Sequence, residues 1–260
     1  MIIAAGDSFV YGSELQSPAN TFTALLGADE CVAWPGYSND AVARTTIERC
    51  EKGGVTGAIV SWTFPSRYEF RFAYNTEQRK SPWYSINPWT AKTDIDSIVD
   101  EFVTNDNDIL EAQKETIKRA RNTGVADFAD VFYKHVGETE YWEVYSSLKE
   151  IVYLQNYLSI KGIPFMFTCA DNSIFDNHTV NDADSVIKSL LNQIDHNKWF
   201  WFPEGYGSNQ TEAPRGFYQW AVENKYSIGT THPLEQAHID ASKLMQGKFN
   251  DLVKKHLQSH

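Results

Sequence analysis

The feature that most constrains the fold of this chain is an alternation of short apolar runs with segments of helical periodicity. Runs that end in turn-forming residues predict strands at 1–5, 30–34, 58–62, 163–169 and, as a fifth, 198–202. Between or after them, helical signals cover 21–26, 39–50, 144–158 and 234–253. Strands that alternate with helices pair in parallel and carry helices on both faces of the sheet. The alternation therefore predicts an α/β fold with a parallel sheet of about five strands.

The alternation is interrupted in two places. From about 65 to 141 the chain carries turn residues and charges without a second apolar core pattern, and 171–197 is a second irregular stretch. We therefore expect a single domain over 1–260, with an insertion at about 65–141.

Charge and composition exclude several classes of function. The 260 residues include 34 acidic and 23 basic side chains, and the net charge of -11 disfavours nucleic acid and anionic membranes as partners. No apolar stretch approaches the ~20 residues of a membrane span, and no leader segment is visible, so we expect a cytoplasmic protein. The three cysteines fit no zinc pattern, and no glycine-rich phosphate loop is present. We predict neither a metal nor an organic cofactor.

Three residues suited to acyl transfer follow the predicted strands or precede the last helix. Ser8, in Gly6-Asp7-Ser8, follows the first strand, Gly36 follows the second, and His232 precedes the last helix. Ligands of parallel sheets bind beyond the carboxyl ends of the strands. A serine nucleophile needs a base, usually histidine, and N–H donors for the oxyanion that forms. An alternative interpretation remains: Asp7 or Ser8 caps an ordinary strand-to-helix turn, and His232 caps the final helix.

These short motifs, taken together and in order, resemble the GDSL, or SGNH, hydrolase family. GDSF after the first strand is similar to the first block of the family, PGYSND to the second, and HPLEQAH to the last. The resemblance implies a flavodoxin-like three-layer α/β/α sandwich. It also implies that Ser8 is the nucleophile, that His232 is the general base, and that the N–H groups of Ser8 and Gly36 bind the oxyanion. More faintly, the whole chain resembles SGNH-like proteins of marine tailed phages.

The chain departs from the family pattern after the third strand, where the family carries an asparagine. Here the strand continues into Ser61-Trp62-Thr63-Phe64-Pro65-Ser66-Arg67. The third oxyanion donor is therefore absent or replaced, and the candidates are Asn39, Ser66 and Arg67.

A second departure concerns the acid that orients the histidine. The family usually has an aspartate three residues before the histidine, and Gly229 occupies that position here. Asp7 adjoins Ser8 but should point elsewhere. We therefore expect a Ser8–His232 dyad in which Nδ1 of His232 is held by a main-chain carbonyl of residues 229–231. A bond from a distant carboxylate, such as Asp171 or Asp195, would contradict the dyad.

The remaining candidates concern substrate binding. Trp83, Trp89 and Arg67 are predicted to shape substrate choice, although Arg67 and Glu69 can also be a surface ion pair. His238 is predicted to be a structural hydrogen-bonding residue. We expect hydrolysis of a small-molecule or carbohydrate ester through an acyl-enzyme. An O-acetylated carbohydrate is the favoured substrate, and a lipid or a simple ester is the alternative. The alternative is a noncatalytic glycan-binding or structural module on the same fold, for example in a virus particle. For a viral protein the expected location is the virion or the host cytoplasm.

Overall fold

A computed structural model describes residues 1–73, 82–91, 123–203 and 214–255 of the chain. Its central sheet has four parallel strands in the order β2-β1-β3-β6. The strands are β1 (Ile2–Ala5), β2 (Glu30–Cys31), β3 (Gly57–Trp62) and β6 (Phe165–Cys169). The expected parallel sheet is confirmed, with one strand fewer than predicted.

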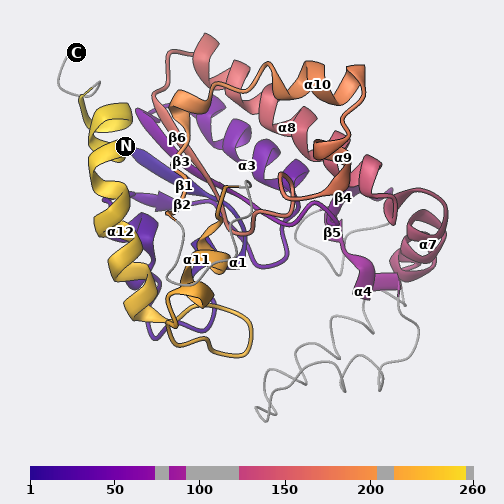
Figure 1. Ribbon diagram of the computed structural model, residues 1–260, viewed down its shortest axis with the longest axis horizontal. Helices are drawn as coiled ribbons and strands as arrows, with labels where there is room; N and C mark the ends of the chain where they lie inside the picture. Colours follow the sequence, from indigo (N-terminus) through magenta and orange to yellow (C-terminus); the bar gives the residue numbers. More distant parts are fainter. Residues whose placement is uncertain (74–81, 92–122, 204–213, 256–260) are drawn as a thin grey trace.

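The sheet is buried on both faces, which makes the fold a three-layer α/β/α sandwich (Figure 1). Side chains of a strand alternate between the faces: Ile3 and Ala5 join the core under α3 (Asn39–Glu51) and α8 (Glu140–Ile160). Ile2 and Ala4 join the core under α11 (Phe217–Glu223) and α12 (Glu235–Phe249). Every residue of β1, β3 and β6 is buried, which explains why these three strands appear in the sequence as mostly apolar runs without alternation.

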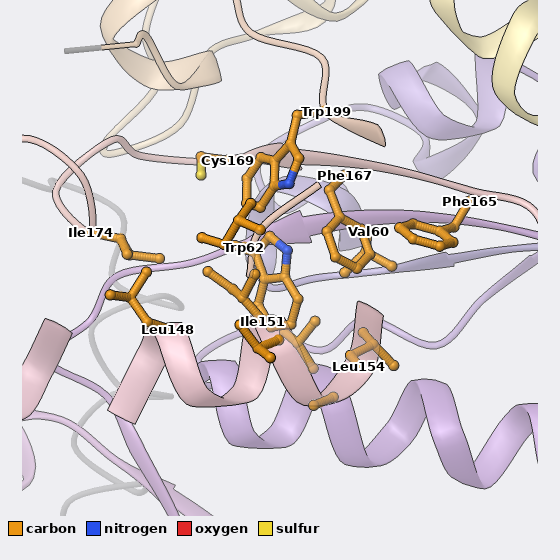
Figure 2. Packing of buried hydrophobic residues seen from close by; sticks show 14 of the residues in the cluster. Val60, Trp62, Leu148, Ile151, Leu154, Phe165, Phe167, Cys169, Ile174 and Trp199 are labelled. Atoms are coloured by element: carbon orange, nitrogen blue, oxygen red, sulfur yellow. The ribbon is translucent and has the colours of Figure 1, made fainter. Parts of the chain in front are cut away.

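Aromatic residues fill the core on the α8 side. Figure 2 shows Trp62 at its centre, with Ile151 and Leu148 of α8 below it and Trp199 above. The Trp62 and Phe167 rings meet edge to face, 5.3 Å between centroids. This packing fixes the end of β3, from which the chain runs to the carboxyl edge of the sheet.

The prediction of a fifth strand at 198–202 is wrong. Trp199 makes one isolated parallel bridge to Phe167, and Phe202 pairs with Arg215 instead of continuing along β6. Trp199 is buried on one face of the sheet and Phe202 on the other. The apolar side chains of this segment are therefore explained by burial on both faces, and no hydrogen-bonded ladder accompanies that burial.

Shorter helices connect these elements. They are α1 (Ser8–Tyr11), α2 (Phe22–Leu25), α9 (His178–Asn181), α10 (Ser185–Leu191), the 3-10 turns η1 (Pro18–Asn20) and η4 (His196–Lys198), and the π-helical end η5 (Asn250–Lys254). The predicted helices at 21–26, 39–50, 144–158 and 234–253 correspond to α2, α3, α8 and α12 with η5.

The segment predicted as an insertion contains an antiparallel hairpin, β4 (Tyr68–Arg71) with β5 (Trp83–Ile86). It also contains α4 (Pro88–Ala91), α7 (Val125–Phe132) and the π-helical turn η3 (Tyr133–Gly137). Contrary to expectation, these elements share an apolar cluster of their own, formed by Tyr68, Ile86, Val125, Ala126, Ala129 and Tyr133. The assignment of the whole chain to one domain stays a prediction.

Within the described part of the chain, no helix combines the length and apolarity needed to cross a bilayer. The cytoplasmic location stays a prediction.

Candidate active site

Ser8 lies where β1 turns into α1, at the carboxyl edge of the sheet. The Asp7 carboxylate caps α1 by accepting a hydrogen bond from the Phe9 N–H at 3.1 Å, and Ser8 is the first residue of the helix. Gly6 allows this tight turn, because a Cβ there would lie 2.6 Å from Val10 Cγ2. The capped strand-to-helix turn is thus confirmed, and Ser8 is the residue that follows the cap.

His232 reaches Ser8 from the loop that precedes α12. Its Nε2 lies 2.7 Å from Ser8 Oγ. The Gly229 N–H donates to the His232 carbonyl at 2.8 Å, and a bridge between Ile228 and Pro233 closes the same turn. The imidazole also packs on Phe9, 4.6 Å between ring centroids. The two residues singled out at opposite ends of the sequence are therefore in direct contact.

The third member of the site is Glu14, which lies six residues after Ser8. Its Oε1 is 2.8 Å from His232 Nδ1, and Thr231 Oγ1 lies 2.8 Å from the same nitrogen. With a proton on Nδ1, the imidazole donates to Glu14, and its Nε2 is free to accept the Ser8 hydroxyl proton. Ser8, His232 and Glu14 thus form one continuous hydrogen-bonded chain.

The expected dyad is therefore wrong. A carboxylate, and not a main-chain carbonyl of 229–231, holds the imidazole. The two distant acids named from the sequence lie elsewhere: Asp171 accepts from the Ser173 N–H, and Asp195 from the Asn197 N–H. No motif marks Glu14 in the sequence, because its approach to His232 depends on how two loops meet.

The loop that carries His232 also holds the Glu14 carboxylate. Its oxygens accept hydrogen bonds from the N–H groups of Thr230 and Thr231 and from the Thr231 hydroxyl. Burial alone would raise the pKa of Glu14, but the bonds from His232, Thr231 and Thr230 hold it below its usual value. The carboxylate is therefore charged at neutral pH.

Gly229 makes room for this carboxylate. A Cβ at position 229 would lie 2.0 Å from Glu14 Oε2. Glu14 itself adopts a left-handed backbone conformation, with φ of 67°, which is uncommon for a residue with a side chain. The glycine that left no acid three residues before His232 in the sequence is thus the residue that admits an acid from another loop.

The N–H groups of Ser8 and Gly36 have no hydrogen-bond acceptor among the described residues. For Ser8 this follows from its place at the start of a helix, where N–H groups lack intrahelical partners. Gly36 lies in a turn with φ of 83°. The turn is held beside α1, because Trp34 meets Tyr11 edge to face at 5.3 Å and Cys31 Sγ donates to the Val10 carbonyl.

No protein-family model matches the chain. No curated protein matches it. Among solved structures, the psychrotrophic esterase EstA from Pseudoalteromonas sp., inhibited by monoethylphosphonate, superimposes with a TM-score of 0.43. The sequence identity is 11%, over 99% of this chain and 98% of that chain. A likeness this distant does not assign an activity to this chain.

Asn39 does not have the role predicted for it. Its amide nitrogen donates to the Thr63 carbonyl at 3.2 Å and to Ser147 Oγ at 3.0 Å, and its oxygen accepts from the Thr63 N–H at 2.9 Å. A buried amide must satisfy its polar atoms, and this one does so by joining α3 to the chain after β3. Both amide hydrogens are used, so the structure provides no free donor there for an oxyanion.

Arg67 lies close to the turn that carries Ser8, and its guanidinium pairs with protein groups. Its Nη1 is 3.0 Å from Asp7 Oδ2, while Glu69 pairs with Arg44 at 2.6 Å. The alternative of an Arg67–Glu69 surface pair is therefore wrong. Ser66, the third candidate donor, accepts a hydrogen bond from the Tyr133 hydroxyl at its carbonyl.

The two tryptophans expected at the substrate lie on the insertion. Trp83 is on β5, with the Arg44 guanidinium 4.9 Å from its ring centroid, and Trp89 is an exposed residue of α4. Figure 1 shows α4 well apart from α1, so the structure does not bring Trp89 to Ser8. The aromatic residues that do adjoin the Ser8 turn are Tyr11 and Trp34, which no sequence pattern had marked.

His238 is structural, as predicted. It is 1% exposed, and its Nδ1 accepts the Phe22 N–H at 3.2 Å. Burial lowers its pKa to about 4, although a hydrogen bond with Pro233 opposes the shift. The side chain is therefore neutral in the folded protein near pH 7.

Proposed function

We propose that this protein is a serine-dependent ester hydrolase of the GDSL/SGNH type that works through an acyl-enzyme. The observation that carries the proposal is the chain of contacts from Ser8 Oγ to His232 Nε2, at 2.7 Å, and from His232 Nδ1 to Glu14 Oε1, at 2.8 Å. Such an arrangement supplies a nucleophile, a base that removes its proton and an acid that orients the base.

In the proposed mechanism, Ser8 Oγ attacks the ester carbonyl while its proton passes to His232 Nε2. Glu14 stabilises the resulting imidazolium through Nδ1. The tetrahedral oxyanion accepts hydrogen bonds from the N–H groups of Ser8 and Gly36, which have no other acceptor in the described chain. His232 then returns the proton to the departing alcohol, which leaves an acyl group on Ser8. Water, deprotonated by His232, attacks the acyl carbon, and His232 returns that proton to Ser8 Oγ as the carboxylic acid leaves.

The surroundings support an uncharged ester, such as an O-acetylated carbohydrate, as the substrate. Trp34 is 57% exposed and Tyr11 is 38% exposed, and they meet next to the Gly36 turn. Exposed aromatic faces of this kind suit the apolar faces of sugar rings or other neutral groups. The net charge of -11 works against anionic substrates.

The proposal is tested with a fluorophosphonate probe and a short-chain ester. The wild-type protein should take up one probe per chain on the Ser8 peptide, located by mass spectrometry, and should hydrolyse the ester. Ser8→Ala should abolish both, whereas the neighbouring Ser13→Ala should keep both. Labelling that persists in Ser8→Ala would reject the assignment. A folded wild-type protein that neither labels nor hydrolyses any ester would favour the noncatalytic module.

A further inference from the structure

Arg67 lies at the junction of three segments that meet beneath the candidate site. Its Nη1 donates to Asp7 Oδ2 at 3.0 Å, to Thr63 Oγ1 at 3.1 Å and to the Tyr37 carbonyl at 3.4 Å. The side chain is 14% exposed, and its guanidinium lies 4.6 Å from the Phe64 ring centroid. One nitrogen of Arg67 therefore connects the turn after β1, the chain after β3 and the loop before α3.

The first of these contacts supports the turn that presents Ser8. Asp7 is completely buried, and its Oδ1 caps the Phe9 N–H while its Oδ2 also accepts the Thr63 hydroxyl proton at 2.5 Å. A buried carboxylate is costly unless it is paired and fully hydrogen-bonded. Arg67 supplies the compensating charge, so the position of the Ser8 N–H depends on this ion pair.

The second contact supports the other N–H donor of the site. Tyr37, whose carbonyl accepts from Arg67, directly follows Gly36. The same guanidinium nitrogen is thus tied to the residue before Ser8 and to the residue after Gly36. The two segments come from different strands, β1 and β2.

We infer that Arg67 is a positioning residue that sets the spacing between the Ser8 and Gly36 N–H groups, and so the geometry of the oxyanion hole. The inference rests on the proposed function and goes beyond it. It gives Arg67 a role different from substrate binding. It also accounts for how this chain maintains an oxyanion site without an asparagine after β3: the third segment contributes through Thr63 and Arg67 rather than through a direct donor.

The test compares Arg67→Met and Arg67→Lys with the wild type on a matched pair of substrates, an ester and its thionoester. Oxyanion donors stabilise a developing oxygen anion better than a sulfur anion, so the ratio of the two kcat values reports the oxyanion hole. Loss of fold, or of Ser8–His232 contact, lowers both rates alike. We expect Arg67→Met to lower kcat for the ester about 10- to 100-fold with little change in KM. We also expect it to reduce the ester-to-thionoester ratio at least several-fold.

Arg67→Lys should lower the ester kcat and the ester-to-thionoester ratio less than Arg67→Met, because lysine keeps a positive charge beside Asp7. Some loss should remain, because lysine lacks the planar guanidinium. The matched control is Arg44→Met, since Arg44 and Glu69 form a similarly buried ion pair with bonds of 2.6 and 2.7 Å. Arg44→Met should lower the thermal stability and leave the ester-to-thionoester ratio of kcat values unchanged. If Arg67→Met does not fold, Asp7→Asn/Arg67→Met removes both buried charges together and is judged by the same ratio.

An unchanged ester kcat, or an equal fall for ester and thionoester, would overturn the role of Arg67. A different result identifies failure of the proposed function itself: wild-type hydrolysis that is absent, or that survives Ser8→Ala. The two failures are therefore distinguishable in one set of measurements.

Discussion

Gly229→Ala is the sharpest test of how Glu14 is accommodated. The new Cβ would lie 2.0 Å from Glu14 Oε2, whereas real Cβ contacts essentially never fall below 3.0 Å. The carboxylate must therefore move by at least 1.0 Å, the difference between these two values. Position 229 has no left-handed φ, so alanine strains the backbone little, and the nearest other contact is Leu234 Cδ2 at 3.2 Å. The substitution thus acts mainly on the carboxylate.

The expected loss follows from this displacement. The His232 Nδ1–Glu14 Oε1 distance of 2.8 Å has little room to lengthen before the hydrogen bond is lost. A misplacement of about 1 Å can cost ~10²-fold, and complete loss of the acid up to ~10⁴-fold in kcat. We expect kcat for a short-chain ester to fall within these limits. The free energy of unfolding should fall by no more than about 1–2 kcal/mol, because the other bonds of Glu14 are exposed.

Two further variants make this reasoning refutable. Gly247→Ala adds a Cβ in α12 with nothing within 4 Å, and it should leave kcat unchanged. Glu14→Asp in the Gly229→Ala background shortens the acid by about 1.5 Å and should recover part of the lost rate, although Glu14→Asp alone lowers it. Full activity of Gly229→Ala, or additive losses in the double variant, would show that the Glu14 carboxylate does not orient His232.

Three other predictions concern stability and substrate choice. The pKa of His238 is about 4 in the folded chain, below the ordinary ~6.5. As the pH falls, the unfolded chain therefore takes up a proton on this histidine before the folded chain does. Its contribution to stability is complete above pH 6.5 and is lost as pH falls to 4, by about 3 kcal/mol. Denaturant unfolding of His238→Asn, which retains an acceptor for the Phe22 N–H, should show a correspondingly flatter pH dependence than the wild type; an unchanged slope contradicts the shift. Trp34→Ala should raise KM for an acetylated sugar about 10-fold and leave a small activated ester nearly unaffected; equal changes on both would remove Trp34 from the substrate site. Trp89→Ala, on α4 away from α1, should change neither KM, and a selective rise for the sugar ester would restore the role first predicted for it.

Much of the fold is local enough to be predicted from the sequence. The run at 58–62 is apolar without alternation, because β3 is covered on both faces and pairs with β1 and β6. The segment 198–202 is also mostly apolar, but it is no strand. Trp199, near its N-terminal end, forms a parallel β-bridge with Phe167, whereas Phe202 forms an antiparallel β-bridge with Arg215 of a different segment. An apolar composition indicates that a segment is buried. It does not indicate whether a neighbouring strand lies in register to form a hydrogen-bonded β-ladder.

The sequence by itself determined the parallel α/β architecture and brought Ser8, Gly36 and His232 to notice, because each lies at a turn that local residues specify. Only the tertiary structure decided which acid serves His232 and what Arg67 and Asn39 contact. Glu14 meets His232 across 218 positions of sequence, and Arg67 meets Asp7 across 60. Contacts of that separation are set by how loops pack on a finished sheet. In the sequence, Gly229 indicates only that the expected acid is missing. In the folded chain, the absence of a side chain at Gly229 leaves the space that the Glu14 carboxylate occupies.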